Sequence, residues 1–329
     1  MEYKRLGKTG LQVSRLTLGM MSYGDKKIQK WYLDIDEARP LINKAIDLGI
    51  NFFDTANVYS SGRSEEITGT LLKDYRDDVI IATKVFFPLT GYDKTDKVNK
   101  SGLSRYNINK AINESLKRLQ MDHVDLYQIH RLDPYVNELE LLKTLNHLIV
   151  EGKTLHIGAS SMFAWQFLKL LNTAEKAGLE PFRTMQNHYN LVYREEEREM
   201  FPLCKDQNIA TIPWSPLARG FLSGKYKRSE EPKGARVESD SLVKSRFFKP
   251  EDFDVVERVL EIASEKDAKP TQIALAWLFS KDHVTSPIIG ATKIEHLEQA
   301  VDSLSIKLSQ DEVRRLEEPY KAHPVIGHS

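Results

Sequence analysis

The chain has 329 residues, of which 41% are hydrophobic and 29% are charged, a composition typical of a globular protein. Its 47 Lys and Arg residues balance its 47 Asp and Glu residues, so no overall charge favours a nucleic acid or an anionic membrane as partner. The single cysteine, Cys204, excludes a disulfide within the chain, and no run approaches the roughly 20 apolar residues of a membrane span. We therefore expect a cytoplasmic protein that forms one domain over residues 1–329.

Apolar segments of strand length alternate with amphipathic segments of helix length along the chain. Alternating units of this kind predict a parallel sheet, and about eight of them favour closure into a (β/α)8 TIM barrel. The rival is a doubly wound sheet with G-x-G-x-x-G after its first strand, but residues 18–22 read Leu-Gly-Met-Met-Ser. The predicted strands are 16–19, 50–55, 79–84, 124–130, 155–159, 184–187, 209–213 and 285–290. The predicted helices lie around 38–46, from 64, at 108–119, 139–145, 167–177, from 193, and at 255–263, 271–280 and 297–301.

Four segments depart from a minimal barrel. Residues 2–14, with the turn Gly-Lys-Thr-Gly at 7–10, predict a β-hairpin that closes the bottom. The segments 85–104 and 214–250 are long and weakly periodic, as loops that cover a substrate usually are. The run 193–199, Tyr-Arg-Glu-Glu-Glu-Arg-Glu, predicts a solvated helix face with charge pairs four residues apart.

Ionisable residues lie at the ends of three successive predicted strands. They are Asp54, Lys84 and His130, each preceded by an apolar run. Because the carboxyl ends of barrel strands converge on one mouth, we expect these side chains to meet there. Tyr59 lies five residues beyond Asp54 and can fold back over the same mouth.

These four side chains suit the reduction of a carbonyl group. A free tyrosine, with a pKa of about 10, is a weak acid at neutral pH. An adjacent Lys84 ammonium would lower the pKa of Tyr59, and Asp54 would keep Lys84 charged. His130 would act as a neutral donor that orients the carbonyl oxygen. Each residue alone has an ordinary structural explanation, but their joint position at strand ends favours general acid–base catalysis by Tyr59.

The same residues resemble a known family. Residues 49–56, Gly-Ile-Asn-Phe-Phe-Asp-Thr-Ala, together with Tyr59, Thr83-Lys84 and Gln128-Ile129-His130, are similar to the aldo-keto reductase superfamily. Its members are NAD(P)H-dependent (β/α)8 barrels, and the four residues above match its catalytic tetrad. The aryl-alcohol dehydrogenase-like and versiconal-reductase-like branch is the most similar, through segments 157–162, 186–190, 214–220 and 317–327. The resemblance implies reversible NADPH-dependent reduction of aldehydes or ketones, aryl or otherwise apolar, to alcohols.

By this resemblance, two sets of residues bind the cofactor. Ser160 and Gln186 would hold the nicotinamide carboxamide, and Trp214 would lie beside the ring. The family often has Asn where this chain has Ser161. The pyrophosphate would run along a loop that follows Trp214, through Ser215, Leu217, Gly220 and Leu222.

A second phosphate site is expected after the last strand, where barrels place a helix amino terminus. Its residues would be Gly290, Thr292 and Lys293. Lys293 would pair with a 2′-phosphate, which makes NADPH the expected cofactor and NADH the less favoured one. Gln299 would bond the adenine.

The substrate site and two rival functions are less specified. Aromatic walls from Trp31, Phe86 and Phe87 suit a flat or apolar carbonyl, and Arg131 would meet a carboxylate or phosphate or form an ordinary salt bridge.

No metal site is expected, because no close ligand spacing such as H-E-x-x-H or C-x-x-C occurs. A nicotinamide-nucleotide-sensing subunit with slow turnover is the main alternative, and a Schiff-base role for Lys84 is a third. The oligomeric state stays open.

Overall fold

The structure of the protein, a computed structural model, describes residues 1–92, 98–228 and 247–328. Within these residues eight strands run parallel in the order β10-β3-β4-β5-β6-β7-β8-β9. The two ends of this sheet also meet, because Thr285 N donates to Thr211 O at 2.9 Å and Ile288 N donates to Pro213 O at 2.8 Å. The sheet therefore closes, and the predicted (β/α)8 barrel is confirmed. The strands are β3 (Thr17–Gly19), β4 (Phe52–Asp54), β5 (Ile80–Val85), β6 (Val124–Ile129), β7 (Thr154–Ser160), β8 (Thr184–Gln186), β9 (Ala210–Thr211) and β10 (Ile288–Ile289).

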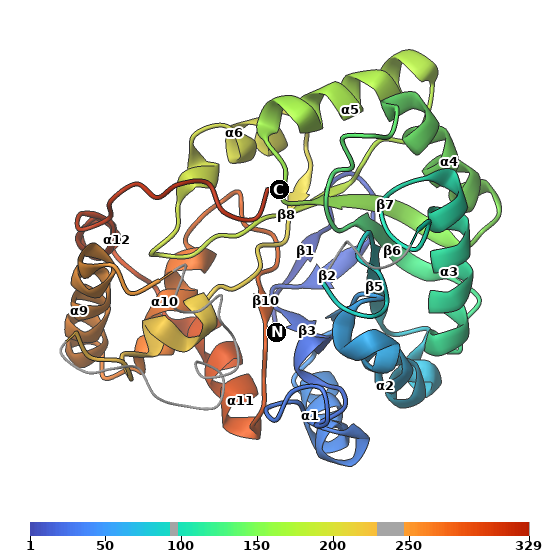
Figure 1. Cartoon of the computed structure of the whole chain (residues 1–329). Coiled ribbons are helices and arrows are strands. Elements are labelled where there is room, and N and C mark those ends of the chain that lie inside the picture. The colour runs from blue at the N-terminus through green and yellow to red at the C-terminus, as the bar shows by residue number, and fades with distance from the viewer. Residues whose placement is uncertain (93–97, 229–246, 329) are drawn as a thin grey trace.

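Helices surround the barrel on its outside (Figure 1). Three of them begin at Asp34, Ser104 and Asn137, whose side chains accept hydrogen bonds from the first helical turn. Each strand is followed by a segment that covers the outer face of the sheet. The helices are α1 (Ile35–Asp47), α2 (Arg63–Leu72), α3 (Arg105–Leu119), α4 (Glu138–Val150), α5 (Ala164–Ala177), α6 (Met200–Asp206), α9 (Pro250–Glu265), α10 (Pro270–Phe279), α11 (Ile294–Asp302) and α12 (Gln310–Glu317).

Side chains inside the barrel lie in layers. Phe52, Ala82 and Leu126 belong to a small apolar cluster that is separate from the main core. Side chains on a strand alternate between its two faces, so residues two positions further along point to the same side. Asp54 and Lys84 therefore lie in the next layer, at the carboxyl ends of their strands. The apolar layer supports the ionisable one from below.

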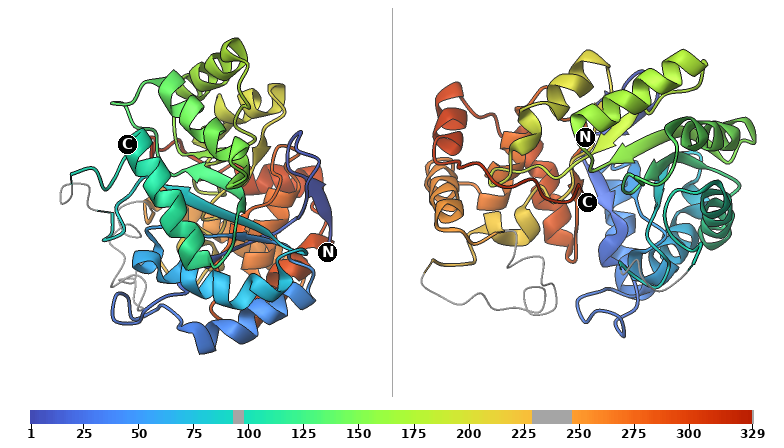
Figure 2. Two further views of the ribbon diagram at one scale, coloured as in Figure 1. Left: turned by 90° about the vertical axis from the view of Figure 1, so that its right-hand side faces the viewer. Right: turned by 45° about the horizontal axis from the view of Figure 1, so that its top comes forward.

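A two-stranded hairpin closes the amino-terminal end of the barrel, as predicted. Strand β1 (Tyr3–Arg5) pairs antiparallel with β2 (Gln12–Ser14). Leu6 and Val13 of this hairpin are fully buried and complete the apolar cluster inside the barrel. The turn needs glycine at position 7, because its φ is +58° and a Cβ there would lie 2.9 Å from Asn208 O. The amino and carboxyl termini lie on opposite sides of the molecule (Figure 2).

One helix prediction was wrong. The charged run from Tyr193 does not form a solvated helix; it forms a 3₁₀ turn, η4 (Glu195–Glu197), and α6 begins only at Met200. Tyr193 and Glu196 are buried, since the carboxyl-terminal segment packs over them. The predicted strands at 209–213 and 285–290 are shorter in the structure, because outside β9 and β10 the chain there pairs only through isolated bridges among the described residues. The predicted loops 85–104 and 214–250 lie partly outside the described residues. None of the described helices has the length and apolarity that crossing a membrane requires.

Candidate active site

The four predicted catalytic side chains meet at the mouth of the barrel. Lys84 Nζ donates to Asp54 Oδ2 at 2.6 Å and to Thr55 O at 2.7 Å, and its third contact is Tyr59 Oη at 3.3 Å. An ammonium has three donors, so these three contacts fix its position. Lys84 and Asp54 are 0% and 2% exposed along their side chains. Asp54 ends β4, Lys84 lies in β5, and Tyr59 begins the 3₁₀ turn η2 (Tyr59–Gly62).

Two glutamines hold Asp54 from the other side. Gln128 Nε2 donates to Asp54 Oδ1 at 2.9 Å, and Gln186 Nε2 donates to the same oxygen at 3.0 Å. Both Oδ atoms of Asp54 therefore accept hydrogen bonds from fixed donors. Sequence reasoning gave Gln128 no role, although strand alternation placed it on the inner face with His130.

His130 follows β6 and packs against two aromatic rings. Its ring lies edge-on to Tyr59 with centroids 5.9 Å apart, and edge-on to Phe87 with centroids 5.0 Å apart. Burial holds the pKa of His130 well below its usual range, and the positive charges of Arg131 and Lys84 act in the same direction. His130 is therefore neutral at physiological pH, as predicted.

The expected pKa of Tyr59 is corrected by the structure. Burial raises the pKa of the Tyr59 hydroxyl, and the carboxylate of Asp54 raises it further, whereas Arg131 acts in the opposite direction. The expectation considered only the neighbouring ammonium and neglected the loss of solvent. Burial likewise lowers the pKa of Lys84, and the ion pair with Asp54 opposes that shift. Tyr59 therefore carries its proton at neutral pH.

Ser160, Gln186 and Trp214, which are expected at the nicotinamide, form a continuous wall together with Ser161 and Asn187. We call these five residues the amide wall. Ser160 Oγ donates to Gln186 O at 2.7 Å. Trp214 Nε1 donates to Ser161 Oγ at 3.2 Å, and Ser161 N donates to Asn187 Oδ1 at 3.1 Å. Gln186 bridges the wall to Asp54, so this wall and the catalytic side chains share one hydrogen-bond network. Asn187 was not predicted, and it supplies an amide beside Ser161.

The expected pyrophosphate segment has an unusual backbone. Ser215, Ala218, Arg219 and Gly220 all have positive φ, at +55°, +47°, +55° and +88°. These conformations fold the segment into tight turns, in which Ala218 N donates to Ser215 O at 3.0 Å and Gly220 N donates to Leu217 O at 2.8 Å. A Cβ on Gly220 would lie 3.3 Å from Lys225 Nζ, so this lysine borders the same loop. Sequence reasoning missed Lys225, which the pair Gly224-Lys225 just after the segment could have indicated. Leu217 precedes the 3₁₀ turn η5 (Ala218–Ser223), in which Leu222 is buried.

The second expected phosphate site lies at the start of α11. Lys293 is the residue before this helix, and its own side chain does not cap the first turn. The N–H groups of that turn can therefore serve an anion. Gly290 and Thr292 precede Lys293, and Gln299 lies later on the helix, partly exposed. Burial lowers the pKa of His296, and the positive charges of Lys293 and Lys225 act in the same direction.

The expected substrate residues are partly brought together. Phe86 and Phe87 are buried and pack edge-to-face at 5.1 Å, and Arg131 lies over the Phe87 ring at 5.6 Å. Trp31 packs edge-on against Tyr32 at 4.5 Å, and Tyr32 acts electrostatically on Tyr59. Phe87 thus borders the catalytic side chains directly, and Trp31 lies one residue further out.

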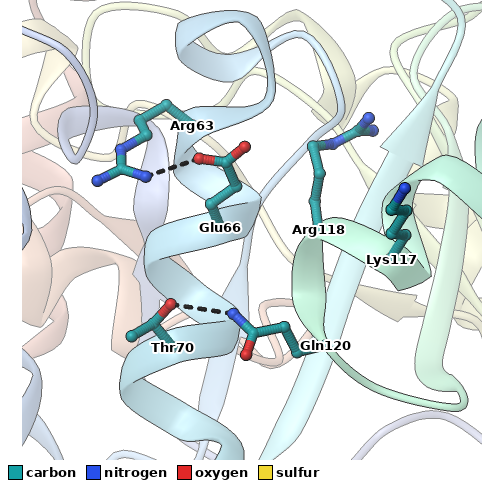
Figure 3. A pocket seen from close by; sticks show the side chains of 6 residues that line it. All are labelled: Arg63, Glu66, Thr70, Lys117, Arg118 and Gln120. Atoms are coloured by element: carbon teal, nitrogen blue, oxygen red, sulfur yellow. Dashed lines mark hydrogen bonds and ion pairs between the residues drawn. The ribbon is translucent and has the colours of Figure 1, made fainter.

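A separate groove of about 330 Å³ lies on the outside of the barrel between α2 and α3 (Figure 3). It contains Arg63, Lys117 and Arg118, but Arg63 is bound to Glu66 at 2.7 Å and Arg118 to the buried Glu65 at 2.7 Å. None of its lining residues comes from a strand end. The groove is therefore distinct from the mouth where the acid–base residues gather.

Comparisons with known proteins agree with this geometry. The profile of the Aldo/keto reductase family matches residues 15–321. Versiconal hemiacetal acetate reductase of Aspergillus parasiticus is 42% identical over 337 residues, 97% of each chain. A Schizosaccharomyces pombe protein assigned by name to the aryl-alcohol dehydrogenases is 40% identical over 346 residues, 99% of this chain and 97% of the relative. An aldo-keto reductase of Fusarium vanettenii is 39% identical over 351 residues, 100% of this chain and 93% of the relative. The resemblance drawn from the sequence is confirmed.

Proposed function

The chain belongs to the aldo/keto reductase family and is an NAD(P)H-dependent oxidoreductase, and we propose that it reduces aldehydes or ketones to alcohols with NADPH, using Tyr59 as general acid. The observation that carries the proposal is the position of Lys84 Nζ between Asp54 Oδ2 at 2.6 Å and Tyr59 Oη at 3.3 Å. A tyrosine in contact with a fixed ammonium can release its proton into a closed site, because the phenolate left behind is stabilised there.

The chain's own residues divide the work of the reaction. Bound NADPH supplies the hydride to the carbonyl carbon. As negative charge develops on the carbonyl oxygen, Tyr59 transfers its proton to that oxygen and Lys84 stabilises the phenolate. Asp54 keeps Lys84 protonated, and neutral His130 orients the oxygen. The raised pKa of Tyr59 suits this direction, since the proton stays on the hydroxyl until the substrate oxygen becomes basic.

The cofactor proposal uses the residues predicted from the sequence. The amide wall offers Ser160 and Gln186 to the carboxamide, and Lys225, which borders the loop at Gly220, offers a cation to the pyrophosphate. The uncapped start of α11 and Lys293 offer a cation and free N–H groups to a 2′-phosphate. NADH has no such phosphate, so we propose NADPH as the preferred cofactor.

The substrate proposal is an aryl or otherwise apolar carbonyl compound. Phe86 and Phe87 are buried aromatic side chains beside His130, and they suit a flat apolar group. The names of two relatives refer to an aryl alcohol and to versiconal hemiacetal acetate. Their similarity extends over nearly the whole chain, which supports the same class of substrate here.

Fluorescence titration with NADPH and NADH, followed by nicotinamide absorbance with a panel of aryl aldehydes, tests the proposal. We expect tighter binding of NADPH and aldehyde-dependent oxidation of the bound cofactor. Tight binding with no turnover across the panel would favour the nucleotide-sensing alternative. Binding of neither nucleotide would refute the proposal. Borohydride trapping with an aldehyde should leave Lys84 unlabelled, since a Lys84 adduct would mean Schiff-base chemistry instead.

A further inference from the structure

Glu196 is a buried carboxylate that lies outside the catalytic side chains and bonds to two separate regions. It is 3% exposed and lies in the turn η4. Its Oε2 accepts from Asn187 Nδ2, and its Oε1 bonds His328 Nε2 at 3.1 Å. A carboxylate only accepts hydrogen bonds, so both partners are donors and the Nε2 of His328 carries a proton.

On one side, Glu196 fixes the amide wall through Asn187. The Oδ1 of Asn187 accepts from Ser161 N at 3.1 Å, and Asn187 O accepts from Trp214 N at 2.9 Å. Trp214 Nε1 in turn donates to Ser161 Oγ at 3.2 Å. Because Glu196 occupies the side-chain nitrogen of Asn187, it determines which atom of this amide faces Ser161.

On the other side, Glu196 holds residues 318–328, which we call the C-terminal tail. Ile326 N donates to Tyr193 Oη at 3.0 Å, and the His328 ring packs edge-on against Phe163 at 4.9 Å. A Cβ on Gly327 would lie 3.4 Å from the Trp214 ring. The tail therefore ends against the amide wall, near the carboxyl end of β8 (Figure 1).

We infer that Glu196 is a positioning residue that couples the C-terminal tail to the nicotinamide-binding wall. The inference builds on the proposed function, since it takes the wall to bind the nicotinamide. An energetic link of this kind is reciprocal: a docked tail supports the wall, and an occupied wall stabilises the tail. The tail is then held more firmly when the cofactor is in place.

The variant Glu196→Gln breaks this link with little change in shape. An amide has one acceptor and one donor where the carboxylate has two acceptors, so it bonds both Asn187 Nδ2 and His328 Nε2 only if the proton of His328 moves to Nδ1, a buried atom with no hydrogen-bond partner among the described residues. We expect the Kd for NADPH to rise about tenfold, since one buried donor is left unsatisfied. The Kd for adenosine 2′,5′-bisphosphate, which lacks the nicotinamide half, should stay within about twofold.

Glu195→Gln is the matched control. Glu195 holds the start of the tail, through Tyr320 Oη at 2.5 Å and His323 N at 2.9 Å, whereas the end of the tail contacts Trp214 through Gly327 and Glu196 through His328. This variant should keep the affinity for NADPH. Hydrogen exchange of the tail supplies a second readout: NADPH should protect residues 320–328 in the parent protein and in Glu195→Gln, but not in Glu196→Gln.

The outcomes separate this inference from the proposed function. If the parent protein binds NADPH but Glu196→Gln binds it equally well, the coupling is refuted. Equal losses for NADPH and the bisphosphate would also refute it, because they indicate a general structural role. A parent protein that binds neither ligand refutes the proposed function itself. If Glu196→Gln does not fold, His328→Ala breaks the same chain at the tail, and a Kd for NADPH raised about threefold is expected.

Discussion

The two sides of the barrel mouth position their functional groups by different means. On the side of β4 to β6, contacts between side chains position them: Lys84 and Asp54 form an almost fully buried ion pair on regular strands. On the opposite side, from Ser215 to Gly220, the backbone conformation positions the functional groups, through four residues with positive φ. The first side depends on residue types and proton affinities, whereas the second depends on the conformation of the backbone.

This difference indicates how each side should respond to substitution. The side of β4 to β6 should be sensitive to the loss of single polar atoms, because burial removes the solvent that could replace them. Within the segment 215–220 on the opposite side, changes of backbone conformation should matter more than changes of side chain. Five sets of substitutions test this contrast, from the largest expected effect to the smallest.

Removal of one oxygen at Tyr59 should have the largest effect. Tyr59→Phe leaves the ring in contact with His130 but removes the proton donor, so we expect kcat to fall about 10³-fold. The Kd for NADPH, measured by fluorescence titration, should change by no more than about threefold. Equal losses of binding and turnover would contradict the role of Tyr59 as acid.

Loss of the Lys84 charge should also lower stability. Lys84→Met leaves Asp54 buried without its cation, and we expect the free energy of unfolding in urea to fall by about 3 kcal/mol. The control is Lys44→Met, which removes an exposed ion pair with Glu298 and should lower the free energy of unfolding far less. Similar losses in the two variants would show that the interior pair is not ionised.

The nucleotide side should distinguish two lysines. Lys293→Met is expected to raise the Kd for NADPH about tenfold and leave NADH unchanged, because only NADPH has a 2′-phosphate. Lys225 borders the loop at Gly220, so Lys225→Met should weaken both cofactors by similar factors. Titration of both variants with both cofactors gives the comparison. An equal effect of Lys293→Met on NADPH and NADH would disprove its selective role.

The neutral state of His130 predicts a pH effect on stability. Its pKa in the folded protein is lowered, so the unfolded chain takes up a proton first as the pH falls below about 6.5. Stability is therefore lost as the pH decreases from 6.5 toward the folded pKa, by at most about 1.4 kcal/mol per pH unit for this one group. His130→Asn should reduce this slope in urea unfolding between pH 6.5 and 5. An unchanged slope would mean that His130 is protonated in the folded protein.

The smallest effect should come from the backbone of the loop. Gly220→Ala places a Cβ on a residue with a φ of +88°, which costs about 1 kcal/mol, and should lower both the melting temperature and the affinity for NADPH. Ala218→Gly removes a Cβ from a residue with a φ of +47°, so affinity should be retained. If both variants bind NADPH like the parent protein, the loop conformation does not determine phosphate binding.

The sequence predicted the barrel and the meeting of the four acid–base residues for a simple reason. Parallel strands bring their carboxyl ends together, so Asp54, Lys84 and His130 could be placed from the strands alone. Glu196 could not be placed in this way. It lies in a run of charges that is typical of a solvated helix, and it is buried only because His328, 132 residues later, packs over it. The pKa of Tyr59 was misjudged for a related reason, since burial is a property of the whole fold.

The hairpin at the amino terminus has a consequence for the order of events. Leu6 and Val13 fill the amino-terminal end of the barrel together with Phe52, Ala82 and Leu126, so ligands enter and leave at the opposite end. The nucleotide and the carbonyl compound must use the same opening there. The ligand that lies deeper must bind first and dissociate last, so we expect ordered binding. With the nucleotide as the first ligand, the oxidised nucleotide would compete only with the reduced nucleotide, whereas the alcohol product would not compete with it.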